Sequence, residues 1–186
     1  MIGRHSDIEV VAAAASGEEA VALFCSHRPD VTLMDLQLPG MSGVEAIRAI
    51  RAEESTARII VLTMYHGDED IYQALQAGAT TYLTKEALSD ELVPMLREVN
   101  AGGRPIPPKV AAVLATRALQ PTLSTREIEV LQLLAKGMRN KEIAGALGIS
   151  EQTAKVHVKH LLAKLQVNDR TAAVSVALER GFIHLK

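Results

Sequence analysis

Apolar runs alternate with amphipathic segments along residues 8–101. The apolar runs are rich in Val, Ile, Leu, Thr and Ala and end at turn residues, which predicts buried strands at 8–15, 31–34, 59–62 and 81–84. Apolar residues at helical spacing between them predict helices at about 16–28, 43–52, 68–77 and 89–101. Ser16 and Ser89 are the candidate N-caps of the first and last of these helices. Strands that alternate with helices predict an α/β fold with a parallel sheet.

From residue 123 to the end only helical periodicity remains. Asn140 is placed to cap one helix, Gly148 to end it and Ser150 to cap the next. That second helix has an apolar side, and its opposite side carries Gln152, Lys155, Val156 and Lys159. Such a stripe can reach base edges in a DNA major groove, which favours a helix-turn-helix. A solvated lysine face on an ordinary helical hairpin is the alternative.

The segment between the two halves has the composition of a linker, with Gly-Gly at 102–103 and three prolines at 105–108. A short helix at 109–119 is expected inside it. The sequence therefore predicts domains at 1–102 and 120–186, joined by a linker at 103–119. The acidic half has a net charge of −9 over residues 1–101, whereas residues 102–123 carry +3 and residues 124–186 carry +4. The basic half is the one that suits nucleic acid.

Composition excludes other classes of protein. No apolar run approaches a membrane span, and no basic-then-apolar leader opens the chain. The single cysteine, Cys25, excludes an internal disulfide and suits a reducing cytoplasm. A cytoplasmic protein of two small domains, with no membrane partner, is expected.

Three polar residues each follow or end a predicted strand: Asp35, Thr63 and Lys85. Because the carboxyl ends of parallel strands meet at one edge of a sheet, these side chains are expected to converge. A carboxylate, a hydroxyl and an ammonium together could accept and hold a phosphoryl group, with Asp35 as the nucleophile. The alternative is three solvated strand ends.

The run from LSTREIEV through NKEIA and TAKVHVKHLLAKL to RTAAV resembles the four-helix DNA-binding domain of LuxR-type regulators. The resemblance implies base contacts from Lys155, Val156 and Lys159. It also implies backbone contacts from Asn140, Thr153 and His160. By the same resemblance the last helix forms a homodimer contact on double-stranded DNA through Ala173, Val176 and Ala177.

VTLMDLQLPGMSG, VLTMYH and TTYLTKE, in that order, resemble the flavodoxin-like receiver domain of response regulators. The resemblance makes Asp35 the phosphoacceptor of a sensor histidine kinase, and Thr63, Tyr82 and Lys85 the residues that respond to the phosphoryl group. A receiver, a linker and a LuxR-type domain give the order of NarL/FixJ-type response regulators. A transcription factor controlled by phosphorylation of Asp35 is therefore expected.

The part of the chain that resembles a receiver lacks the first strand that the family usually has. Receivers open with a strand that bears two acidic residues, which hold Mg²⁺ beside the phosphoacceptor, and Asp7 and Glu9 are poor substitutes for that pair. Mg²⁺ held by Asp35 alone would have too few oxygen ligands. Met1 is accordingly expected to be an internal methionine of a longer protein. The alternative is a regulator that works without phosphate, in which the receiver half serves only as a dimerisation or interaction module.

An enzyme is not expected. Aspartate-based phosphatases also use a nucleophilic aspartate after a strand, but they typically need a second aspartate two positions later. In this chain that position is Gln37.

Overall fold

The computed structural model describes residues 5–64, 67–85, 88–117 and 119–184. Two compact units result, one formed by Met1–His66 and Asp70–Ala115, the other by Gly67–Glu69 and Thr116–Lys186. The boundary falls inside the predicted linker. No helix in the described part of the chain has the length and apolar character needed to cross a membrane.

The first unit is built on a parallel sheet in the order β1-β2-β3. Its strands are β1 Thr32–Met34, β2 Ile59–Thr63 and β3 Thr81–Thr84. Its helices are α1 Gly17–His27, α2 Gly43–Glu53, α4 Leu88–Asn100 and most of α3 Asp68–Gln76 and α5 Pro108–Arg117. Met34 pairs with Val61, and Thr63 pairs with Thr84, so the carboxyl ends of the strands lie together. The expected flavodoxin-like α/β class is thus confirmed.

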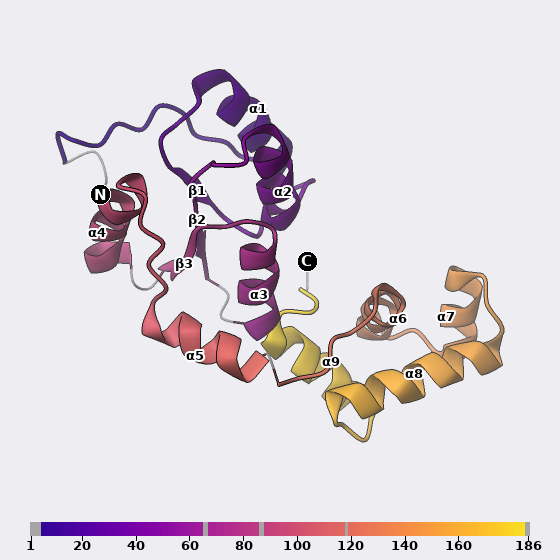
Figure 1. Cartoon of the computed structure of the whole chain (residues 1–186). Coiled ribbons are helices and arrows are strands. Elements are labelled where there is room, and N and C mark those ends of the chain that lie inside the picture. The colour runs from indigo at the N-terminus through magenta and orange to yellow at the C-terminus, as the bar shows by residue number, and fades with distance from the viewer. Residues whose placement is uncertain (1–4, 65–66, 86–87, 118, 185–186) are drawn as a thin grey trace. The chain divides into compact units, whose positions relative to one another are not determined.

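Both faces of this sheet are covered by helices (Figure 1). Ile59 and Val61 of β2 pack with α1, α2 and α3, and Ile60 packs with α4 on the other face. The alternation follows from the period of two along a strand, and burial on both faces explains why the strands read as continuous apolar runs. Val110 of α5 is buried in the first of these clusters.

The predicted strand at 8–15 is wrong. Residues 8–14 have no regular secondary structure, and Val10 and Val11 are 62% and 48% exposed. A strand needs a neighbour for its backbone groups, and in the described sheet β1 pairs only with β2. Asp7 instead holds this segment to α4, since its carboxylate accepts two hydrogen bonds from Arg97 at 2.9 and 3.2 Å.

The described residues of the second unit form the helices α6 Thr125–Ala135, α7 Asn140–Leu147, α8 Glu151–Leu165 and α9 Arg170–Arg180. One apolar cluster joins them, with Leu131, Ile143 and Leu161 fully buried at its centre. The predicted all-α domain is therefore present.

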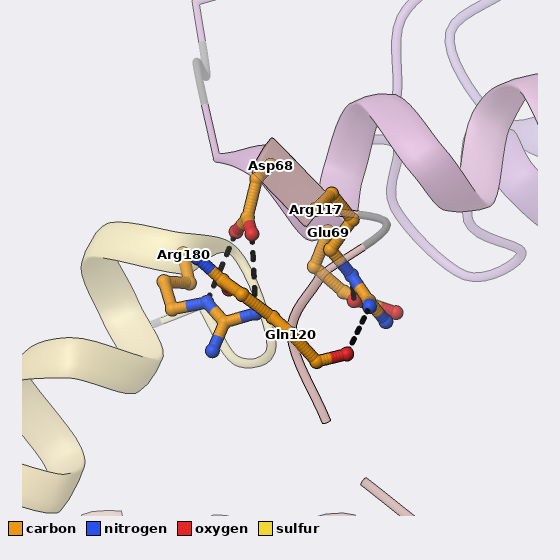
Figure 2. Close-up of polar contacts among 5 residues, drawn as sticks. All are labelled: Asp68, Glu69, Arg117, Gln120 and Arg180. Carbon is orange, nitrogen blue, oxygen red and sulfur yellow. Dashed lines mark hydrogen bonds and ion pairs between the residues drawn. The ribbon is translucent and has the colours of Figure 1, made fainter. Parts of the chain in front are cut away.

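Within the second unit, two arginines hold the carboxylates of the segment Gly67–Glu69 (Figure 2). Arg180 donates to both carboxylate oxygens of Asp68, at 3.1 and 3.2 Å. Arg117 donates to Glu69 at 2.7 Å and to the carbonyl of Gln120 at 3.3 Å. The Arg117 and Glu69 side chains are only 4% and 7% exposed, so this ion pair lies in the interior. These contacts explain why Gly67–Glu69 groups with the second unit.

Two predicted helix caps are shifted. α4 begins at Leu88, so Ser89 lies inside the helix. α7 begins at Asn140, and its N-cap is Arg139, whose backbone N–H donates to the Glu142 carboxylate at 2.6 Å. Asn140 is therefore the first helical residue and does not cap the helix.

Candidate functional site

Asp35 and Lys85 meet at the carboxyl edge of the sheet. Asp35 follows β1 by one residue and Lys85 follows β3, as the sequence predicted. The Lys85 ammonium contacts a carboxylate oxygen of Asp35, and both side chains are about one-third exposed or less. A carboxylate that solvent reaches and a cation beside it form a site to which an anionic group could be transferred.

The loop after β1 presents the Asp35 carboxylate. The backbone N–H of Gln37 donates to its other oxygen at 3.1 Å, and the N–H of Gly43 donates to the Leu36 carbonyl at 3.0 Å. A Cβ at Gly43 would lie 2.0 Å from the Asp35 carbonyl oxygen. Only glycine therefore lets the start of α2 pack this closely against the loop.

Thr63 is the last residue of β2 and Tyr82 lies in β3, two strands that end at this edge of the sheet. Both side chains are fully buried. Burial, together with the negative charges of Asp70 and Asp35, raises the pKa of the Tyr82 phenol far above its ordinary value. The Tyr82 ring thus already occupies the interior in this structure.

The residues around Asp35 do not fit a magnesium site. Mg²⁺ takes octahedral geometry and needs several oxygen ligands. In the described residues no three His, Cys, Asp or Glu side chains come together as ligands, and the Asp35 carboxylate is in contact with Lys85. Asp7 is paired with Arg97, and Glu9 is exposed, so neither replaces the acidic pair.

In the second unit, α7 and α8 form a helix-turn-helix. Gly148 ends α7 in the left-handed conformation with φ 63°, where a residue without Cβ is favoured. The Ser150 hydroxyl then accepts from the Thr153 backbone N–H at 3.0 Å and caps α8. Both features were predicted from the sequence.

The outer face of α8 carries the predicted base-contacting residues. Lys155, Val156 and Lys159 are all exposed, and Val156 is 42% exposed although it is apolar. The Lys155 ammonium lies 2.9 Å from the Glu151 carboxylate. The opposite face, with Val158, Leu161 and Leu165, is buried.

The predicted backbone-contacting residues lie near the same helix-turn-helix. Thr153 and His160 are exposed, and the Thr153 hydroxyl hydrogen-bonds with that of Ser150 at 2.8 Å. Asn140 is half-buried, and its side-chain oxygen has no hydrogen-bond partner among the described residues. That buried oxygen cannot contact a phosphate, so only the NH₂ group of the same amide could donate to one.

Sequence reasoning missed the residue that holds α8 in place. The Lys164 ammonium lies 2.7 Å from the Glu127 carboxylate of α6. The same carboxylate accepts from the backbone N–H of Ser124 at 2.7 Å and forms the capping box of α6. The capping box can be read from the sequence, whereas the distant Lys164 gives no local signal.

The predicted dimer surface on α9 needs correction. Ala173 and Ala177 are completely buried in the apolar cluster of their own unit, so a second chain cannot reach them. The resemblance to LuxR-type regulators implied a contact face at these alanines, and in this structure they pack inward. Val176 is half-buried and stays a candidate.

Comparison with known proteins agrees with both halves. Residues 1–97 match the response regulator receiver domain, and residues 121–177 match the bacterial regulatory proteins of the luxR family. The response regulator protein VraR of Staphylococcus aureus is 37% identical over 187 residues, which cover 98% of this chain and 90% of VraR.

Solved structures show the same relationship. The response regulator ChrA of a heme-sensing two-component system is 37% identical with a TM-score of 0.55, covering 98% of this chain and 89% of ChrA. RcsB from Salmonella enterica serovar Typhimurium, solved bound to a promoter with the phosphomimetic BeF3⁻, is 25% identical with a TM-score of 0.66, covering 94% and 87%. The chain therefore belongs to the response regulators, transcription factors of two-component systems that join a receiver to a luxR-family DNA-binding domain.

Proposed function

We propose that Asp35 accepts a phosphoryl group from a sensor histidine kinase and that this modification controls DNA binding through α8. The observation that carries the proposal is the contact between Lys85 and the Asp35 carboxylate at the carboxyl edge of the sheet. It supplies a nucleophile and a charge-neutralising cation in one place, at a position that solvent reaches.

On this chain the proposed transfer uses Asp35, Lys85 and Thr63, and the kinase supplies the phosphohistidine. An Asp35 carboxylate oxygen attacks the phosphorus of a phosphohistidine, and the new P–O bond forms as the P–N bond breaks. The imidazole nitrogen leaves with the electron pair and is protonated. Lys85 neutralises the added charge, and the Thr63 hydroxyl donates to a phosphoryl oxygen. Receivers generally use Mg²⁺ for this reaction, but the donor groups of the described residues around Asp35 do not fit the ion.

In this proposal the position of the Tyr82 ring distinguishes the two conformations of the receiver. Because its ring is already buried, phosphorylation would stabilise this arrangement against one with the ring outside. A ligand can shift such an equilibrium only by its differential affinity for the two states, so the contact between Thr63 and the phosphoryl group is the proposed source of that difference.

On DNA we propose that Lys155, Val156 and Lys159 reach base edges in the major groove, and that Thr153 and His160 contact the backbone. Asn140 is a weaker candidate because its side chain is half-buried. The proposal includes a homodimer that reads two half-sites, with Val176 as the candidate contact on α9.

The test is intact-mass analysis after treatment with acetyl phosphate and Mg²⁺, combined with binding of DNA fragments selected from a random pool. We expect a mass gain of one phosphoryl group that is lost in Asp35→Asn, and tighter DNA binding by the phosphorylated chain. Glu45→Gln, at an exposed carboxylate engaged by Ser42, is a matched control that should keep the mass gain. A gain that persists in Asp35→Asn would assign the phosphoacceptor elsewhere.

A second function follows from the poor fit to magnesium. The chain would then bind DNA without phosphorylation, with the receiver as an interaction module. Equal affinity for DNA before and after acetyl phosphate, with no mass gain, would establish this function and exclude the first.

A further inference from the structure

A basic cavity lies at the edge of the sheet opposite to Asp35. Its volume is about 270 Å³. Arg58 and Thr80, which directly precede β2 and β3, line it, so it sits at the amino ends of the strands. The remaining wall comes from the ends of α2, α3 and α4, and all of it belongs to the first unit.

Three arginines line this cavity: Arg51, Arg58 and Arg104. No acidic residue is among the lining residues, and within the described part of the chain none of the three arginines forms an ion pair. Arg51 donates a hydrogen bond to the Ala57 carbonyl at 3.1 Å, which fixes its guanidinium at the rim. Arg58 is half-buried and Arg104 is exposed, so solvent reaches the charge.

Helix ends account for only part of this charge. α2, α3 and α4 finish at Glu53, Gln76 and Asn100, next to the lining residues. A helix C-terminus carries roughly half a negative charge and favours a nearby arginine. Three such ends offset about half of the three guanidinium charges, which leaves a positive field in the cavity.

Two glycines in the wall of the cavity adopt backbone conformations that side chains disfavour. Gly78 and Gly102 have φ of 108° and 91°, which side-chain-bearing residues rarely adopt. The Arg51 side chain lies directly over Gly78, where a Cβ would be 2.8 Å from its Nε atom. The glycine therefore permits the guanidinium stem to lie across the wall.

We propose that this cavity binds a small multivalent oxyanion of the size of pyrophosphate. Guanidinium forks pair with phosphate or carboxylate oxygens in bidentate fashion, and two or more forks around one cavity favour an anion with more than one charge. The volume falls just below the range of about 300–1,000 Å³ for drug-sized ligands, so a dinucleotide is too large. The cavity is separate from the phosphoacceptor, and the proposal does not rest on it.

The test is titration of the ¹⁵N-labelled full chain with pyrophosphate, against chloride at matched ionic strength. Saturable shifts are expected for the amides of Gly78, Gly102 and Gly103, with none for Gly43 beside Asp35. A parallel rise in melting temperature should follow, since a ligand that binds the folded state stabilises it. Citrate in place of pyrophosphate separates a preference for phosphate from a preference for any multivalent anion.

Matched variants locate the binding. Arg51→Gln and Arg104→Gln should weaken it at least about tenfold by removing a fork. Arg48→Gln, one turn earlier in α2 and outside the cavity, should keep it, as should Lys85→Gln at the other edge. Unchanged amide spectra without ligand verify that the variants fold. Equal responses from all variants, shifts centred on Gly43, or no saturable shift would each overturn the proposal.

Discussion

The Glu127 carboxylate lies 2.7 Å from the Lys164 ammonium and at the same time caps its own helix through Ser124. One side chain thus closes the N-terminus of α6 and ties it to α8. Because α8 carries the proposed DNA-contacting residues, the orientation of that surface depends on a buried residue of another helix.

Glu127→Gln should lower the stability of the second unit in a pH-dependent way. Burial alone would raise the pKa of Glu127, but hydrogen bonds from Lys164 and Ser124 hold it below the ordinary value of 4.5. The charged group therefore stabilises the fold above that value, and the contribution is lost as the pH falls through the lower pKa of the folded state. At neutral pH we expect a loss of about 1–2 kcal/mol, which shrinks on acidification.

Urea unfolding followed by circular dichroism measures this effect. The chain's tyrosines all precede residue 83, so tyrosine fluorescence reports separately on the first unit. Glu129→Gln, at a partly exposed pair with Arg126, is the control and should cost less than about 1 kcal/mol. The prediction is contradicted if the difference in unfolding free energy between the wild-type chain and Glu127→Gln is the same at neutral and at acidic pH.

Lys159→Ala should weaken binding to the selected DNA by on the order of 1–3 kcal/mol and relax specificity at one base.

Glu151→Gln should instead tighten binding slightly, because it releases Lys155 from a 2.9 Å ion pair and removes a negative charge near phosphates. Fluorescence anisotropy at several salt concentrations measures both, with the exposed Lys136→Ala as control. Equal losses on selected and random DNA for Lys159→Ala would mark a phosphate contact instead.

Two glycine substitutions should have opposite effects. Gly43→Ala places a Cβ 2.0 Å from the Asp35 carbonyl oxygen, so the loop must shift, at a cost on the order of 2–3 kcal/mol. Gly145→Ala, inside α7, meets no atom within 4 Å and should stabilise its helix by about 0.5–1 kcal/mol. Tyrosine fluorescence follows the first and circular dichroism the second. A neutral Gly43→Ala would mean that the loop is not held by this contact.

Tyr82 should stay protonated in alkaline solution until the first unit unfolds. Burial and the carboxylates of Asp70 and Asp35 raise the pKa of its phenol above the ordinary value of 10.0. The unfolded chain then releases a proton that the folded chain keeps, so stability falls above that pH by up to about 1.4 kcal/mol per pH unit. The tyrosinate absorbance of Tyr82, taken as the difference from Tyr82→Phe, should rise only together with unfolding, and Tyr82→Phe should remove the added alkaline sensitivity. Tyrosinate from Tyr82 in the folded chain would contradict the burial.

Local pattern predicted much of the fold. The strands that end before Asp35 and Lys85 are continuous apolar runs, and the topology of a parallel sheet brings those two residues together as expected. The caps at Ser16 and Ser150 depend on residues three positions away, so they too could be read correctly.

Features that depend on distant partners could not be read in this way. The run at 8–15 has strand composition, but pairing decides whether a strand forms. The alanines of α9 have helical spacing whether they pack inward or outward. Arg104 of the basic cavity is far from Arg51 and Arg58 in sequence, and only the ends of the strands and helices bring the three together.

Helix α5 has a practical consequence for anyone who separates the two halves. The Gly-Gly at 102–103 looks like a natural place to end a receiver fragment. Beyond it, however, Val110 is buried in the apolar interior of the receiver, and Val113 and Leu114 pack against that interior. A receiver expressed without them would expose that surface to water and to other chains, and aggregation is the expected fate of such a fragment. Dissection should therefore leave α5 attached to the receiver.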